Sequence, residues 1–153
     1  MAGKIKIDFS LDIIPGKSIG GISLGDNVDD VTLSLSEGVS FEIFDFENFG
    51  VKYHCCKLGG GAVSFTIDES GKIISLWCEP PYKGSFNGKL YPGITAKELR
   101  EVTRKQNLVK GYLVVDNIYG LYFGMPDDID DFNSFSDVDD GVYFNELYVG
   151  SLQ

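Results

Sequence analysis

The feature that most constrains this chain is a short segment that occurs twice. Residues 21–35 read GISLGDNVDDVTLSL and residues 93–103 read GITAKELREVT, so each begins with Gly-Ile-(Ser/Thr) and later contains Val-Thr. An aromatic-rich stretch of alternating polarity follows each segment. We therefore predict a degenerate tandem repeat of a helix followed by antiparallel strands, with half-repeats at about 18–78 and 90–150. Two halves of this size must share one core, so the 153 residues are expected to form a single domain, 1–153.

Each repeated segment carries the signals of a short helix. Asp26 is a predicted N-cap for the first helix, and Thr95 with Glu98 forms a T-x-x-E capping box at the start of the second. The apolar residues lie on one face of a 3.6-residue period, namely Val28, Val31 and Leu35 in the first helix and Leu99 and Val102 in the second. The sequence thus predicts two short helices, each with one apolar face.

The segments outside the helices alternate in polarity, as strands do. A turn over Glu69–Gly71 joins two of them as a hairpin. The predicted strands cover residues 4–14, 39–45, 51–57, 62–68, 72–78, 108–115, 119–124 and 142–149, with a further short strand at 86–90. This order of elements favours an α+β fold with a mostly antiparallel sheet and two short helices.

The acidic charge of the chain indicates which classes of partner it can bind. The chain carries 13 Lys and Arg against 23 Asp and Glu, a net charge of -10, and no basic residue follows Lys110. Such a field repels nucleic acid and anionic membranes, and it attracts a basic partner over a Debye length of about 8 Å. We therefore expect a basic protein partner, no nucleic acid and no membrane. The N-terminus alternates like a strand and has no signal-peptide core, so a cytoplasmic location is expected.

An acidic loop at residues 125–141 combines aspartates with aromatic residues. Aromatic residues beside charges are typical of protein interfaces, so we predict that this loop contacts the partner. The predicted partner-binding residues are Asp127, Asp128, Asp130, Asp131, Phe132, Phe135, Asp137, Asp139, Asp140 and Tyr143. A purely solvated loop and a calcium site are the alternatives, although Ser136 and Val138 would fall on ligand positions of an EF-hand and so break its pattern.

Other candidate sites have less support. His54, the only histidine, adjoins Cys55 and Cys56, but neighbouring side chains of a strand point to opposite faces, which argues against a shared zinc site. The sequence contains none of the common catalytic or dinucleotide-binding motifs, so we predict no enzymatic activity, no metal and no cofactor. Core packing explains most of the aromatic residues. Trp77, with Tyr82 and Phe86, is an alternative lining for a small-ligand cleft.

Two segments, GISLGDNVDDV (21–31) and GSFNGKLYPGITAKELREV (84–102), are set among aromatic antiparallel strands. With them the chain resembles small bacterial immunity proteins, in particular those that neutralise toxins of contact-dependent growth inhibition systems. Its layout also resembles the β-lactamase inhibitory proteins. The resemblance implies a protein that binds a cognate toxin domain and occludes its active site without chemistry.

The charge of the chain agrees with what this resemblance implies. A nuclease toxin binds a polyanion and tends to be basic, so a basic nuclease domain held in a stoichiometric complex is the expected partner. A second contact mode is strand addition by a toxin hairpin at an exposed sheet edge. The alternative function is an inhibitor or small-ligand-binding module of a different system.

Overall fold

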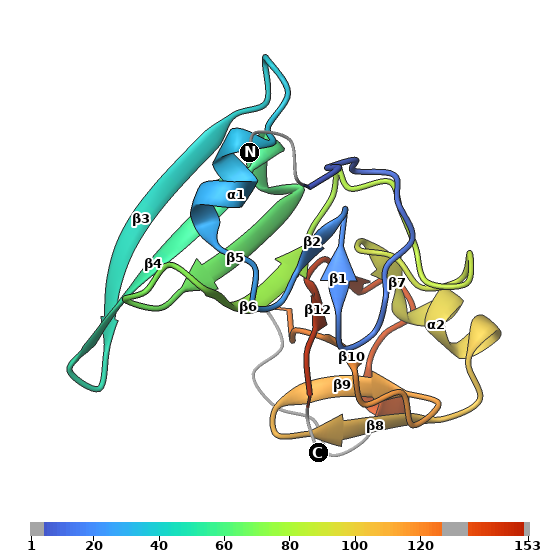
Figure 1. The fold of residues 1–153 in the computed structure, drawn as a ribbon. Coiled ribbons are helices and arrows are strands. Elements are labelled where there is room, and N and C mark those ends of the chain that lie inside the picture. Colours follow the sequence, from blue (N-terminus) through green and yellow to red (C-terminus); the bar gives the residue numbers. More distant parts are fainter. Residues whose placement is uncertain (1–4, 127–134, 152–153) are drawn as a thin grey trace.

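An antiparallel sheet of eight strands forms the centre of the computed structural model, which describes residues 5–126 and 135–151 (Figure 1). The strands follow the order β3-β4-β5-β6-β12-β10-β9-β8 across the sheet. Their bounds in this order are Phe41–Asn48, Val51–Leu58, Val63–Ile67, Ile73–Cys78, Leu147–Val149, Leu121–Phe123, Tyr112–Val115 and Gln106–Val109. The sheet therefore has β3 and β8 at its two edges and the β6–β12 pair in its middle.

Short helices and small strand pairs complete the fold. The helices are α1, Val28–Leu33, and α2, Ala96–Val102, and the short 3-10 turns are η1, Gly59–Gly61, and η2, Phe135–Asp137. The small strand pairs are β1, Ser18–Ile19, with β2, Ile22–Ser23, and β7, Ile94–Thr95, with β11, Tyr143–Phe144. The predicted α+β class, with a mostly antiparallel sheet and two short helices, is confirmed.

The capping of the two helices follows the sequence signals with one correction. Thr95 is the N-cap of α2, and its hydroxyl oxygen accepts a hydrogen bond from the Glu98 backbone N–H at 3.2 Å, as predicted. The N-cap of α1 is Asn27, whose side chain accepts from the Asp29 backbone N–H at 2.9 Å. Asp26 was therefore the wrong residue, because its carboxylate accepts from the Ser23 backbone N–H at 2.8 Å and so fixes the preceding turn.

The strands predicted between residues 39 and 78 are confirmed, including the hairpin turn before β6, but the predicted first strand is wrong. Residues 5–14 form no strand; only Ile14 makes a single bridge, to Ser18. The Asp8 carboxylate accepts from both the backbone N–H and the hydroxyl of Ser10, and this local turn competes with a strand ladder. Apolar alternation alone therefore overestimated the regularity of this segment.

Three other predicted strands need correction. The stretch 108–115 is a hairpin of β8 and β9, because Lys110 and Gly111 turn the chain with φ values of 52° and 86°. The stretch 142–149 divides into β11, which pairs with β7, and β12, which enters the central sheet. Residues 86–90 contain only an isolated bridge between Phe86 and Leu90.

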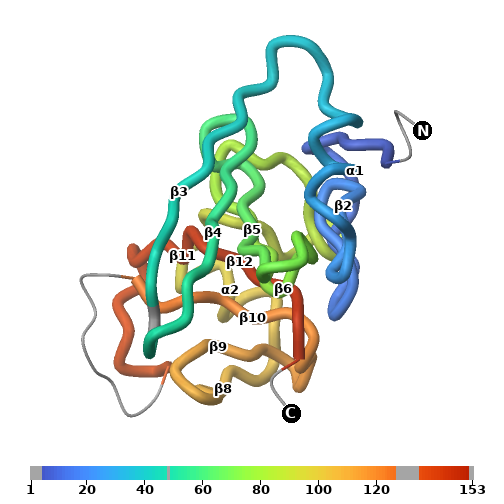
Figure 2. Tube along the Cα trace, turned by 60° about the vertical axis from the view of Figure 1, so that its left-hand side comes forward, coloured from blue at the N-terminus to red at the C-terminus, as the bar shows by residue number. Residues whose placement is uncertain are grey.

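One side of the sheet packs against the helices and is termed the core face. Leu76 on β6 lies between Phe65 on β5 and Val149 on β12, and all three side chains are fully buried or nearly so. Val31 of α1 and Leu99 of α2 belong to the same buried cluster. Figure 1 shows α1 and the β1–β2 pair in front of this face, and in Figure 2 the long β3–β4 hairpin lies on one side of the view with α1 and β2 on the other.

Candidate functional site

The opposite side of the sheet, termed the open face, carries aromatic rings. In Leu147-Tyr148-Val149 of β12 the outer residues are buried in the core, so the tyrosine between them points to the open face. The aromatic residues of this face, all partly or substantially exposed, are Phe44, Phe46, Tyr53, Trp77, Tyr112, Tyr122 and Tyr148. These aromatic residues do not pack in the core, although core packing was predicted to explain most of the aromatic residues.

Four of these rings form a continuous row across β6, β12, β10 and β9. This aromatic row consists of Trp77, Tyr148, Tyr122 and Tyr112, with centroids of successive rings 5.3, 5.5 and 4.8 Å apart. The Tyr112 ring also lies 5.5 Å from that of Tyr148, so the three tyrosine rings contact one another. The Tyr148 and Tyr122 planes are 3° apart, so these rings stack on each other. Burial raises the pKa of both phenols, which keeps them protonated at neutral pH. Both rings are partly exposed on the open face, where tyrosine side chains are suited to protein contacts.

The open face continues onto the β3–β4 hairpin, which carries apolar side chains in solvent. Phe44 and Phe46 of the edge strand β3 are 47% and 43% exposed, and Phe49 at the hairpin turn is 97% exposed. The Phe46 ring stacks on Tyr53 with centroids 5.3 Å apart, while the Lys57 ammonium lies 5.5 Å from the centroid of Phe44. Exposed rings in such a group are unusual for an isolated monomer and mark interaction surfaces.

Two carboxylates face each other at one end of the aromatic row. The register that pairs Trp77 with Tyr148 places Glu79 opposite Glu146 on the same face. Burial, and next the charge of Glu146, raise the pKa of Glu79. The Tyr148 hydroxyl donates to Glu146 at 3.1 Å. Both carboxylates line a pocket of about 490 Å³, and Glu79 also lines an adjoining hollow of about 450 Å³.

The residues predicted to bind a partner are only partly brought together. Asp127, Asp128, Asp130, Asp131 and Phe132 lie outside the described residues. Asp137 and Asp139 are exposed. Tyr143, 62% exposed, lines the pocket beside Glu79 and Glu146. Of the predicted residues that the structure describes, Tyr143 is thus the one that joins the carboxylate pocket.

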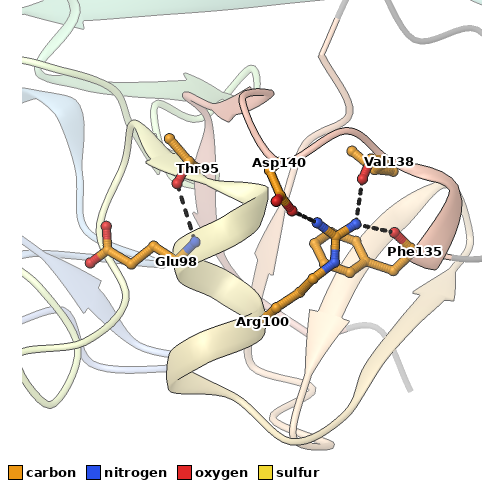
Figure 3. Close-up of polar contacts among 6 residues, drawn as sticks. All are labelled: Thr95, Glu98, Arg100, Phe135, Val138 and Asp140. Atoms are coloured by element: carbon orange, nitrogen blue, oxygen red, sulfur yellow. Dashed lines mark hydrogen bonds and ion pairs between the residues drawn. The ribbon is translucent and has the colours of Figure 1, made fainter.

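Two of the predicted residues contribute to the internal structure of the protein (Figure 3). Phe135 is buried, and its ring packs 5.9 Å from that of Phe144 between centroids. Arg100 of α2 donates to the Asp140 carboxylate and to the backbone oxygens of Phe135 and Val138, and its guanidinium carbon lies 4.8 Å from the Phe135 centroid. The charge of Asp140 is therefore paired within the chain, and this network ties the segment after residue 134 to α2.

The alternative sites proposed from the sequence are separated by the fold. His54 contacts the Asp45 carboxylate across the β3–β4 hairpin, and no group of three or more His, Cys, Asp or Glu within residues 5–126 and 135–151 is placed to hold a metal ion. Tyr82 is buried in the core and donates to the Leu11 backbone oxygen at 2.6 Å, whereas Trp77 lies on the open face. These two rings do not line a common cleft.

The aromatic row and the carboxylate pair were missed by sequence reasoning, although a signal for both exists. A tyrosine flanked by two buried aliphatic or phenylalanine residues recurs in Leu121-Tyr122-Phe123 and Leu147-Tyr148-Val149. Because side chains alternate along a strand, this pattern predicts rings on the face away from the core. Because residues two apart on a strand share a face, Glu79 lies on the same face as Trp77, and Glu146 on the same face as Tyr148. Strand order, which the sequence did not supply, makes these residues neighbours.

Comparisons with known proteins leave the site to be interpreted from its own chemistry. No protein-family model matches the chain, and searches of curated proteins and of solved structures gave no significant match. Within the described part of the chain, none of the helices has the length and apolar character needed to cross a membrane.

Proposed function

We propose that this protein is a cytoplasmic immunity protein, which binds a cognate toxin domain and neutralises it by occluding the active site in a stoichiometric complex. The observation that carries the proposal is the aromatic open face, which runs from the aromatic row to the β3–β4 hairpin. Aromatic side chains dominate the energetically important centres of protein interfaces. The mechanism is steric and electrostatic, and it requires no catalytic residue.

The charge of the chain supports a basic partner, such as a nuclease domain. The net charge is -10, and every Lys and Arg lies within the first 110 residues. Opposite charges accelerate association and align the partners, while buried aromatic side chains supply most of the affinity. A nuclease cleft that binds polyanionic substrate is complementary to an acidic surface of this kind. The contribution of the loop residues Asp127 to Asp131 to that surface stays a prediction.

The arrangement of the rings favours a protein partner over a small flat ligand. A carbohydrate or a nucleobase stacks on an exposed ring face, but Tyr122 and Tyr148 stack on each other at 3°. Two rings that stack on each other leave less free ring face for a flat ligand, which favours a protein partner. The alternative, a small-ligand-binding module, would draw on the pocket of about 490 Å³ next to Trp77 and Tyr148.

The layout of the sheet supports the proposed tandem repeat. In each half a helix is followed by four strands that fill one half of the sheet from its edge to its centre, β3-β4-β5-β6 after α1 and β8-β9-β10-β12 after α2. Gly-Ile-Ser at 21–23 and Gly-Ile-Thr at 93–95 precede the two helices, and both isoleucines are fully buried. A repeat of this kind doubles the width of the open face available to a partner.

Binding to a toxin domain tests the proposal directly. The probe is the purified toxin-like domain encoded next to the gene for this protein, titrated by calorimetry, with toxin activity measured in parallel. Phe44→Ala and Phe46→Ala should each weaken binding by about 30-fold, because a buried aromatic anchor contributes about 2 kcal/mol or more. Leu33→Ala is the matched control, because Leu33 is an exposed apolar residue, at 57%, on α1, and this helix lies on the side of the sheet opposite the open face.

Three results would count against the proposal. The first is the absence of any complex with the toxin domain at low salt. The second is a complex that leaves the toxin fully active. The third is an equal loss of affinity for Leu33→Ala and Phe46→Ala, which would place the interface elsewhere. A fluorescence change of Trp77 on binding a small metabolite, with no protein present, would favour the alternative module.

A further inference from the structure

The position of Glu79 and Glu146 is unfavourable for the free protein. Cross-strand neighbours on one face have Cβ atoms about 5 Å apart, and like charges in such pairs are destabilising. Both side chains are half-buried, and burial raises the pKa of Glu79 further. A sheet designed only for stability would place opposite charges or apolar residues here.

The surroundings hold the two carboxylates in place. The Trp77 indole lies beside Glu79 on the same face, and the Tyr148 hydroxyl donates to Glu146. Gly124, just after β10, leaves room for Glu146, because a Cβ atom at residue 124 would lie only 2.6 Å from a carboxylate oxygen of Glu146. The two carboxylates are thus oriented by neutral groups, and the pocket in front of them is bordered by Tyr143.

We infer that the open face docks onto a basic protein surface and that an Arg or Lys side chain of this partner enters the pocket between Glu79 and Glu146. This inference rests on the proposed function and specifies the chemistry of its partner. A guanidinium presents five N–H donors in a planar fork that matches carboxylates, and it also packs favourably on aromatic rings. The pocket offers two carboxylates and the exposed ring of Tyr143, so charge and ring chemistry favour the same occupant.

Lys57, a basic residue of the chain itself, does not take the place of the partner's Arg or Lys side chain. Lys57 lies close enough to Glu79 to lower its pKa and lines the adjoining hollow with it, but the Lys57 ammonium group sits over the Phe44 ring. The influence of burial and of Glu146 on Glu79 exceeds that of Lys57. An incoming cation would therefore relieve the repulsion that Lys57 leaves uncompensated.

A small cationic probe tests the site without the toxin. N-acetyl-arginine amide is titrated against the full-length protein while the indole N–H resonance of Trp77 is followed by NMR, and N-acetyl-citrulline amide serves as the uncharged isostere. The arginine probe should shift this resonance with millimolar affinity, the citrulline probe should not, and Glu79→Gln/Glu146→Gln should abolish the shift. Equal shifts with both probes, or no shift with either, would overturn the inference.

The toxin domain provides the second test. Glu79→Gln and Glu146→Gln keep the size of each side chain and, at Glu146, an oxygen for the Tyr148 hydrogen bond, and each should weaken toxin binding by at least about 30-fold. Each should also raise the Tm of the free protein by roughly 1 to 3 °C, because the repulsion is removed. Glu101→Gln, an exposed residue of α2, removes the same charge from another surface and should change affinity less than about 3-fold.

The outcomes separate the two proposals. If the wild-type protein binds and inhibits the toxin, but the Gln variants behave like Glu101→Gln, then the cation site is wrong and the proposed function stands. If the arginine probe binds at the glutamates but no toxin complex forms, then the immunity function fails and the cation site stands. Lower affinity together with higher Tm is the signature of the inferred site, since a purely structural role would lower both.

Discussion

The burial pattern along β6 gives the sharpest test of the sheet register. Leu76 is fully buried between Phe65 and Val149. Ile74 lies two residues earlier, but the register of the β5–β6 ladder shifts at this position, and its side chain is 48% exposed. Leu76→Ala removes three carbon atoms, about 2.4 kcal/mol at about 0.8 kcal/mol per methylene, and the remaining cavity brings the loss to about 3 to 4 kcal/mol. Ile74→Ala should cost about 1 kcal/mol or less.

Urea unfolding followed by circular dichroism measures both variants against the wild-type protein. For a domain of this size, the loss in Leu76→Ala corresponds to a Tm that is roughly 6 to 16 °C lower. Similar losses for the two variants, or a larger loss for Ile74→Ala, would refute the register of β6 and its shift before Leu76. All conclusions about the open face depend on this register.

Three further predictions concern other parts of the protein. Arg100→Met should lower the free energy of unfolding by about 2 kcal/mol, because it removes the charged hydrogen bonds to the segment after residue 134, and a loss below about 0.5 kcal/mol would contradict this role. At pH about 8, a thiol reagent should modify the partly exposed Cys55 faster than the buried Cys56, whose pKa burial raises to about 11, and equal rates in the folded protein would contradict the structure. Burial and the charge of Glu146 raise the pKa of Glu79 in the folded protein above its ordinary value of 4.5, so the fold favours the protonated carboxyl. The stability that this preference provides is fully present below pH 4.5 and is lost as the pH rises through the folded pKa. Urea midpoints of Glu79→Gln should therefore exceed those of the wild type increasingly from about pH 4 to about pH 7, and a constant difference would contradict the raised pKa.

Local signals in the sequence were sufficient for much of the fold. The capping box at Thr95 and Glu98 located α2, because its hydrogen bond spans only three residues. The alternation of polar and apolar residues and the turn at Glu69–Gly71 located the strands from 41 to 78, because both are signals between residues close in the sequence. Segment 5–14 failed because the Asp8 side chain competes for backbone donors, a local interaction that overrides apolar alternation.

The candidate site depended on contacts between distant residues. Glu79 and Glu146 are 67 positions apart, and they become neighbours only because β6 pairs with β12 in the middle of the sheet. Phe135 looked like an interface residue because it stands among aspartates, but its ring is buried against Phe144. Asp140 likewise looked unpaired until the fold placed it beside Arg100. Composition alone predicted a basic partner, and tertiary pairing was needed to find the residues that are proposed to meet it.

The most direct test of the central claim uses Trp77, the only tryptophan of the chain and a member of the aromatic row. Acrylamide quenching of its fluorescence is measured while a tryptophan-free variant of the toxin domain is added. The open-face account predicts that quenching falls and reaches its minimum at one toxin domain per molecule of this protein, in step with the loss of toxin activity. A fully inhibited toxin in a complex that leaves Trp77 as accessible as in the free protein would contradict it.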